Sequence, residues 1–196
     1  MSRVGYSRIE LLLDKGNRRI DMKLPAKLPP EALIIERDTR EQLGYTPDEL
    51  RLPVVDGTLP EGDYRLAAAP NLAVVERKGD LSDLMCVVGR ERRRFETEVQ
   101  RLLSYRHRLL VVESSWEEIE QGNYRGKVSP NAAIGSLLSW QSRGLPVLMA
   151  GSRKRAALYV GRWLYLVAQR HWRQLRAIAH GITDEVGSQR NCEGVS

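Results

Sequence analysis

Cysteine and histidine are scarce in this chain of 196 residues, which contains two cysteines and three histidines. Cys86 falls in a predicted helix and Cys192 near the end of the chain, so the two do not form a disulfide framework. This favours a reducing, intracellular setting, in the cytoplasm or at the nucleoid. The histidines have neither metal-ligand spacing nor cysteine partners, so we expect no zinc site.

Long apolar runs are also missing. The most apolar stretch, residues 156–168, is interrupted by Arg162 and is too short to span a bilayer. The polar N-terminus lacks the apolar core of a signal peptide. We therefore expect no association with a membrane.

Positive charge is what the chain has in excess. Its 31 lysines and arginines outnumber its 25 aspartates and glutamates, which gives a net charge of +6. A polyanionic partner fits this excess, but a merely soluble basic protein fits it about as well. The length is most simply that of one domain with a real core.

Apolar periodicity predicts an α/β fold. Strands are expected at residues 33–37, 64–67, 72–77, 109–113 and 146–150. Helices are expected at residues 47–50 (within a loop at 42–57), 83–106, 116–121, 130–143 and 153–178. Strands alternating with helices in the second half imply parallel strands. The expected segments are an N-terminal β-hairpin and linker (1–30), the main domain (31–180) and a disordered tail (181–196).

Acidic side chains stand at the ends of three predicted strands. Asp38 follows the first strand, Asp63 begins the second, and Glu76 and Lys78 end the third. Residues i and i+2 of a strand point the same way, so Glu76 and Lys78 share a face and Arg77 lies on the other. Converging carboxylates repel one another, which a hard cation such as Mg²⁺ relieves. A lysine beside them suits metal-assisted phosphodiester cleavage.

Taken by itself, the Glu-x-Lys tripeptide is explained by acids scattered over the surface. The three acids and the lysine together, in this order along the chain, are what indicate a site. Asp-Thr-Arg-Glu at 38–41, Gly-Asp-Tyr at 62–64 and Glu-Arg-Lys at 76–78 resemble the XPF-type nucleases, the excision-repair and Mus-class structure-specific endonucleases. The resemblance covers roughly residues 33–175. With Ser-Pro-Asn-Ala at 129–132 and Ser-Trp-Gln at 139–141, the chain is most similar to the short phage and bacterial stand-alone members.

The resemblance implies a restriction-endonuclease-like core, with a mixed central sheet flanked by helices and a PD-(D/E)xK active site. It implies that Mg²⁺, for which Mn²⁺ substitutes, is bound by Asp38, Asp63 and Glu76. The implied catalytic set is Asp38, Asp63, Glu76, Arg77, Lys78 and Asp83.

The chain departs from the family pattern after Lys78. The family's next acid stands four residues later, where this chain has Ser82, between Asp80 and Asp83. A one-residue insertion would make Asp83 the equivalent. Larger relatives carry a tandem helix-hairpin-helix domain that binds DNA and dimerises. We expect none here, because the sequence to Ser196 has no room for one, and branch preference and dimerisation are left open.

Basic side chains are candidates for DNA contacts. One flank of the predicted helix 83–106, extended just past its end, carries Arg90, Arg94, Arg101 and Arg108. These arginines either follow phosphates or belong to a solvated face diluted by glutamates. Arg77 and Arg40 either hold phosphates or pair with acids, and Glu41 either joins the metal shell or neutralises Arg40. The candidates for DNA contacts are Arg40, Arg90, Arg94, Arg101, Arg125 and Lys127.

We therefore expect a metal-dependent DNA endonuclease, acting in DNA repair or recombination or in phage DNA metabolism, with branched or flap DNA as a candidate substrate. The leading alternative is a non-catalytic DNA-binding or scaffold member of the family. Another restriction-like enzyme, such as a junction resolvase or a modification-dependent nuclease, is the third hypothesis. Aromatic residues on several faces of the last predicted helix indicate either deep burial or a homodimer.

Overall fold

The structure is a computed structural model that describes residues 24–192, with side chains up to residue 180. The predicted N-terminal β-hairpin lies outside the described residues. The chain forms two compact units. The larger comprises Leu28–Gln169, and the described part of the smaller comprises residues 24–27 and 170–192.

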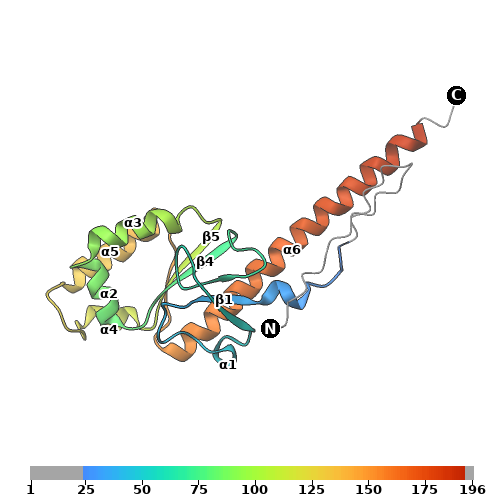
Figure 1. Cartoon of the computed structure of the whole chain (residues 1–196). Helices are drawn as coiled ribbons and strands as arrows, with labels where there is room; N and C mark the ends of the chain where they lie inside the picture. The colour runs from blue at the N-terminus through green and yellow to red at the C-terminus, as the bar shows by residue number, and fades with distance from the viewer. Residues whose placement is uncertain (1–23, 193–196) are drawn as a thin grey trace. The chain divides into compact units, whose positions relative to one another are not determined.

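The larger unit is built on one mixed sheet, which has six strands within the described residues (Figure 1). In spatial order they are β2 (Val54–Gly57), β1 (Ile35–Asp38), β3 (Tyr64–Leu66), β4 (Ala73–Lys78), β5 (His107–Val112) and β6 (Val147–Met149). Strand β3 is antiparallel to β1 and β4, and the other pairs are parallel. The predicted mixed α/β sheet is confirmed.

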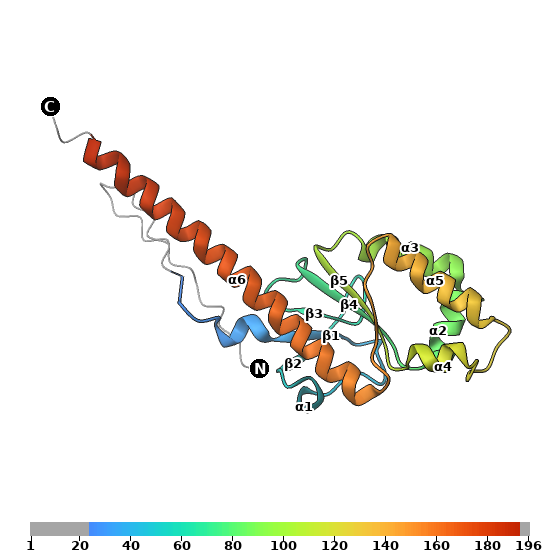
Figure 2. The same ribbon diagram turned by 180° about the vertical axis from the view of Figure 1, so that it is seen from behind.

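Helices cover both faces of this sheet (Figure 2). Alternation along the strands divides the core, because Val75 and Val111 pack in one apolar cluster and Val74 and Leu110 in another. The first cluster includes residues of α6, and the second includes residues of α2, α3, α4 and α5. The helices are η1 (Pro30–Leu33), α1 (Pro47–Leu50), α2 (Leu81–Val88), α3 (Arg92–Leu102), α4 (Trp116–Glu120), α5 (Pro130–Ser142) and α6 (Arg153–Cys192).

The predicted helix 83–106 is two helices. Helix α2 ends at Val88, and α3 starts at Arg92 after a turn at Gly89. Gly89 leaves the helical region with φ −102° and ψ −95°. The apolar spacing continues through the turn because both helices bury their stripe in the same cluster, which is why periodicity alone predicted one helix.

Strand β2 was not expected. The sequence analysis places residues 42–57 in a loop, yet Val54–Gly57 pairs in parallel with β1 at the edge of the sheet. The strand is four residues long and has no fully buried side chain, so no apolar run identified it. The short helix at Pro47–Leu50 is confirmed and has a capping box built by Thr46 and Glu49.

The last helix is longer than predicted. Helix α6 continues through residues 181–192, which the sequence analysis places in a disordered tail after a helix end near Ile178. Glycines at 181 and 187 indicated a tail, but an isolated glycine weakens a helix by only about 1 kcal/mol and does not end it. In the smaller unit, Nε1 of Trp172 donates to the carbonyl of Pro25 at 3.1 Å.

Helix α6 also bears the aromatic residues noted in the sequence. Within the larger unit its buried side includes Val160 and Leu164, and Trp163 packs partly buried against the same core. Tyr159 and Leu166 are 41% and 51% exposed, so burial accounts for some of these side chains and leaves others in solvent. No described helix is both long and apolar enough to cross a bilayer.

Candidate active site

Backbone pairing brings three acids side by side at the ends of neighbouring strands. The amide of Asp38 donates to the carbonyl of Asp63 at 2.9 Å, and the amide of Asp63 donates to the carbonyl of Val75 at 2.8 Å. Asp63 therefore lies between the end of β1 and the end of β4, where Glu76 stands. Gly62 makes the turn before it with φ +67°, a conformation that suits glycine. The predicted convergence of Asp38, Asp63 and Glu76 is present.

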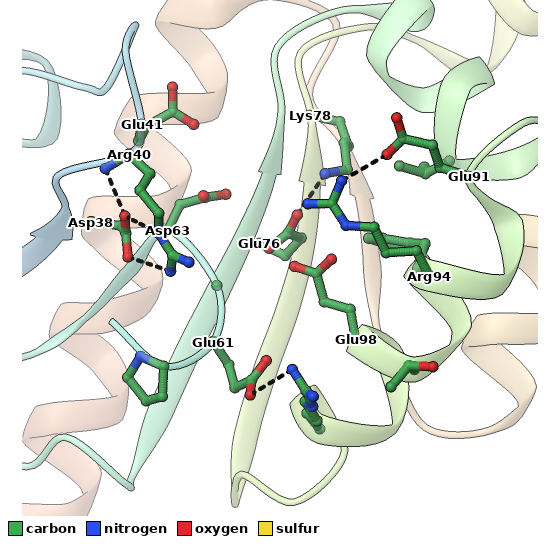
Figure 3. A pocket seen from close by; sticks show the side chains of 16 residues that line it. Asp38, Arg40, Glu41, Glu61, Asp63, Glu76, Lys78, Glu91, Arg94 and Glu98 are labelled. Carbon is green, nitrogen blue, oxygen red and sulfur yellow. Dashed lines mark hydrogen bonds and ion pairs between the residues drawn. The ribbon is translucent and has the colours of Figure 1, made fainter. Parts of the chain in front are cut away.

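A cavity of about 510 Å³ opens over these strand ends (Figure 3). The strand side contributes Asp38, Arg40, Glu41, Glu61, Asp63, Glu76 and Lys78, and α3 contributes Arg94, Phe95, Thr97, Glu98 and Arg101. Carboxylates outnumber cations around it, so the cavity favours a positively charged ligand.

Glu76 and Lys78 form the ion pair at the centre of the cavity. The Nζ atom of Lys78 lies 2.5 Å from Oε1 of Glu76, and their side chains are 14% and 5% exposed. The same Nζ lies 5.0 Å from the centroid of the Phe95 ring. The two side chains share one face of β4, as the alternation predicts, and the pair is held against an apolar surface.

Asp63 and Glu76 are carboxyl groups in an unfavourable environment for an anion. Burial raises the pKa of Asp63 to about 7, although the hydrogen bond from the Arg77 amide acts to lower it. Burial and the nearby Asp63 raise the pKa of Glu76 well above its ordinary value. Burial acts to lower the pKa of Lys78, but Glu76 and Asp63 raise it on balance. A cation between the two carboxylates would relieve this cost.

Asp38 has a different environment. Its Oδ1 accepts from the amide and Nε of Arg40 at 2.7 and 2.8 Å, and its Oδ2 accepts from Nη2 of Arg40 and the amide of Leu59 at 2.8 and 2.9 Å. The Arg40 side chain is the main cause that lowers the Asp38 pKa to about 2. Both oxygens are engaged, so in this structure Asp38 anchors Arg40 and the loop at Leu59.

The donor set fits a magnesium ion through two carboxylates. Among the side chains that the structure describes, no three His, Cys, Asp or Glu groups are placed together to hold a metal. Mg²⁺ keeps several waters and is commonly held by one or two carboxylates with substrate phosphate. Asp63 and Glu76 are the oxygen donors that suit this mode, whereas the predicted third ligand, Asp38, is occupied by its own hydrogen bonds.

Arg77 lies on the opposite face of β4 and does not line the cavity. Its Nε is 2.7 Å from Oε1 of Glu113, its Nη1 is 3.0 Å from Oε1 of Glu41, and its guanidinium lies 5.2 Å from the centre of the Tyr45 ring. Of the two roles left open for Arg77, the ion pair is the one observed. Its contribution to the site is its main-chain amide, which donates to Oδ2 of Asp63 at 2.6 Å.

Two acids of the site were missed in the sequence. Glu113 follows the buried strand β5, next to β4, and the rule that strand ends carry site residues would have identified it. Glu98 of α3 lines the cavity and raises the pKa of both Asp63 and Glu76. Nothing in its local sequence distinguishes it from the other glutamates of that helix.

The structure does not bring Asp83 into the cavity. Asp80 is the N-cap of α2, where its side chain accepts from the amide of Asp83 at 2.8 Å. Oδ2 of Asp83 in turn accepts from the amide of Gly79 at 3.3 Å. These acids therefore form the turn that follows Lys78, and the predicted catalytic role of Asp83 has no direct geometric support.

The predicted DNA-contact residues fall into two places. Arg40, Arg94 and Arg101 line the cavity, where Arg94 pairs with Glu91 at 3.1 Å and Arg101 with Glu61 at 3.4 Å. Arg90, Arg125 and Lys127 line a separate concavity, and their arrangement is treated below.

Arg108, the last arginine of the predicted flank, is not part of it. It lies in β5, and its Nε donates to the carbonyl of Gly144 at 2.7 Å.

Comparisons with known proteins relate the chain to one family and to solved structures of similar fold. A family model described as the ERCC4 domain matches residues 36–162. XPF from Aeropyrum pernix has a similar structure, with a TM-score of 0.56 and 25% identity over 70% of this chain and 66% of that one. A structure of XPF from Aeropyrum pernix in complex with DNA has a TM-score of 0.54 and 21% identity over 83% of this chain and 86% of that one. The search of curated proteins found no match. The predicted restriction-endonuclease-like core is confirmed.

Proposed function

The chain belongs to the ERCC4 domain family of XPF-type nucleases, and from this membership we propose that it is a Mg²⁺-dependent DNA endonuclease for which Mn²⁺ substitutes. The observation that carries the proposal is the Glu76–Lys78 pair, with its 2.5 Å contact, beside the desolvated carboxyl of Asp63. This is the combination of oxygen donors and a fixed cation that phosphodiester hydrolysis requires.

Asp63 and Glu76 are the proposed metal ligands. A bound divalent ion supplies polarisation of the phosphate and a water of lowered pKa. The Arg77 amide fixes the orientation of Asp63, and the buried pair of Arg77 with Glu113 fixes Arg77 itself. The protein thus prepares the two carboxylates before substrate arrives, which avoids reorganisation during the reaction.

Lys78 is the proposed electrostatic residue of the reaction. Its ammonium is held by Glu76 and by the face of the Phe95 ring, so it occupies one position in the cavity. From there it can orient the attacking water and stabilise the negative charge on the pentavalent phosphorus. The two neighbouring carboxylates keep it charged despite its burial.

A non-catalytic DNA-binding or scaffold protein is the second candidate. One observation favours it, because both oxygens of Asp38 are engaged by Arg40 and Leu59. A metal site that needed Asp38 would have to break these hydrogen bonds first. The complete Asp63, Glu76 and Lys78 set favours catalysis instead.

The test is a cleavage assay with the purified full chain. Labelled single-stranded, duplex, flap and four-way-junction DNA are incubated with Mg²⁺, with Mn²⁺ and with EDTA. We expect cutting with either metal and none with EDTA, and the preferred DNA reports whether the substrate is a flap or a junction. No cutting of any substrate by a protein that still binds DNA would favour the scaffold alternative.

Glu76→Gln is the matched site variant, and Glu120→Gln is its control. Glu120 is an exposed residue of α4 and does not line the cavity. We expect Glu76→Gln to abolish cutting and to leave DNA binding largely intact, and Glu120→Gln to behave as the unmodified protein. Cutting by Glu76→Gln at the unmodified rate would exclude this active site.

A further inference from the structure

A second concave site lies across the α2–α3 junction from the active-site cavity. Arg90 of this junction lines the second site, and the next residue, Glu91, lines the first. The second site has a volume of about 390 Å³, within the range of about 300–1,000 Å³ typical of ligand sites. We name it the basic cleft and define it by Met85, Cys86, Arg90, Arg125, Lys127 and Val128.

The two sites differ in charge. Aspartates and glutamates line much of the active-site cavity, whereas none is among the residues of the basic cleft. Within residues 24–180, no ion pair joins Arg125 or Lys127 to an acid, and both are exposed. Arg90 contacts the Sγ atom of Cys86 at 3.2 Å. Glu91 is next to Arg90 but lines the other cavity, so the lining of the basic cleft is positive and attracts an anion.

The floor of the cleft is apolar. Met85 is buried and Val128 is partly buried, whereas the three cations of the cleft are exposed, so we take the two apolar residues as its floor. Gly89 brings the α2–α3 junction close to Val128. A Cβ atom at Gly89 would lie 3.0 Å from Cγ2 of Val128. An apolar floor under a cationic rim suits a nucleotide, with its sugar and base on the floor and its phosphates on the rim.

We propose that the basic cleft holds a single-stranded segment of the DNA substrate, beside the nucleotide at the active site. This proposal rests on the proposed function. Duplex DNA presents its phosphates along the outside of a rigid helix, whereas an unpaired strand can place single nucleotides in a concavity. The shared α2–α3 junction allows one strand to pass from the acidic cavity to the basic cleft.

Cys86 provides a direct probe of occupancy, because it lines the cleft and its thiol is free. The protein carries Cys192→Ser and Glu76→Gln, and EDTA is present, so the readout does not depend on cleavage. The alkylation rate of Cys86 by iodoacetamide is measured with oligothymidylate, with a duplex of equal nucleotide concentration, and with thymidine monophosphate. We expect oligothymidylate to slow alkylation several-fold, and the other two to slow it much less.

Three other outcomes would each overturn the proposal. Equal protection by the duplex removes the preference for a single strand. Equal protection by thymidine monophosphate makes the cleft a site for free nucleotides. No protection by any of them shows that the cleft is empty when DNA is bound. If oligothymidylate protects Cys86 but the unmodified protein never cuts DNA, the proposed nuclease function is wrong, and binding of a single strand in the basic cleft stands.

A second measurement tests the cations. Arg125→Ala with Lys127→Ala should lower the slope of log affinity for oligothymidylate against log salt by about 1.4, from two phosphate contacts at about 0.7 each. Lys154→Ala with Arg155→Ala removes the same charge from exposed positions at the start of α6, which do not line the cleft. An equal fall in this control would show that only net charge matters and would overturn the proposal.

Discussion

Arg77 and Glu113 form a buried ion pair, with Nε 2.7 Å from Oε1 and with side chains only 6% and 7% exposed. The pair joins β4 to β5 at the ends that carry the site. Because Arg77 follows Glu76 and precedes Lys78, its anchoring fixes the direction of both. The proposed active site therefore depends on a residue outside its cavity.

Glu113→Gln should destabilise the fold and reduce cleavage together. Losing one partner of a buried pair costs about 3–5 kcal/mol, and we expect about 3 because Glu41 still contacts Arg77. Urea unfolding measures this loss. Glu117→Gln, an exposed change in α4, is the control and should leave the midpoint unaltered. Unfolding of Glu113→Gln at the unmodified midpoint would mean that the pair contributes nothing.

Asp38→Asn and Asp63→Asn should separate a structural acid from the proposed metal ligand. Asp38 accepts charge-assisted hydrogen bonds from Arg40, so Asp38→Asn should lower the free energy of unfolding by about 2 kcal/mol at pH 7. Asp63 is desolvated as an anion, so Asp63→Asn should leave stability unchanged or raise it while abolishing cleavage. Urea unfolding and the cleavage assay give both values, and a large loss of stability in Asp63→Asn would contradict this assignment.

The stability of the metal-free protein should fall as pH rises from about 4 to about 7. The Asp63 pKa is 3.8 in an exposed carboxyl and about 7 in the fold. Between these values the folded state binds more protons than the unfolded state, so raising the pH favours unfolding. Glu76, whose pKa is also raised, acts in the same direction. Asp38, with a pKa of about 2 in the fold and 3.8 when exposed, acts in the opposite direction only below about pH 5.

Urea midpoints measured with EDTA from pH 4.5 to pH 8 test this dependence. Asp63→Asn should have a shallower fall than the unmodified protein, because it lacks one of the two groups. Adding Mg²⁺ should raise the midpoint most at high pH, where the carboxylates are ionised. Parallel curves for the two proteins would show that Asp63 does not titrate in this range.

Asp80→Ala should mainly lower stability, whereas Asp83→Ala should mainly lower the cleavage rate. Asp80→Ala removes the N-cap of α2 and should cost about 1 kcal/mol of stability. Asp83→Ala frees the Gly79 amide directly after Lys78, so it should reduce the cleavage rate more than Asp80→Ala does. Thermal unfolding and cleavage rates of the two variants are compared. A greater loss of activity in Asp80→Ala would reverse the assignment.

Arg94→Ala with Arg101→Ala should flatten the salt dependence of duplex binding. Two lost phosphate contacts at about 0.9 each would lower the slope by about 1.8. Fluorescence anisotropy over a salt series measures the slope, with Lys154→Ala and Arg155→Ala together as the charge-matched control. An unchanged slope would mean that these arginines serve only their ion pairs with Glu91 and Glu61.

The faces on which the side chains of β4 lie were predictable, because they depend only on neighbouring residues of the same strand. Alternation along β4 was enough to place Glu76 and Lys78 on one face and Arg77 on the other. The burial of Arg77 was not predictable, because it depends on Glu113, which stands 36 residues later in the chain. Asp38 shows the same limit, since its motif indicated an acid at the site but not that Arg40 occupies both its oxygens.

The elements that escaped prediction lack a strong local pattern. Strand β2 has no buried side chain, and Gly89 divides a helical stripe without interrupting its apolar spacing. The end of α6 was predicted too early, because a glycine ends a helix only where the surrounding structure requires a turn. In each case, pairing or packing with a distant segment decides the outcome.

The order of the site residues along the chain has a consequence for synthesis on the ribosome. Among the residues that the structure describes, those that line the cavity run from Asp38 to Arg101, so the nascent chain contains all of them before β5 is complete. It still lacks Glu113, the partner that Arg77 needs once it is buried. At about 5–20 residues per second, translation supplies that acid within seconds. A nascent chain stalled before Glu113 would carry the whole cavity lining with one buried pair incomplete.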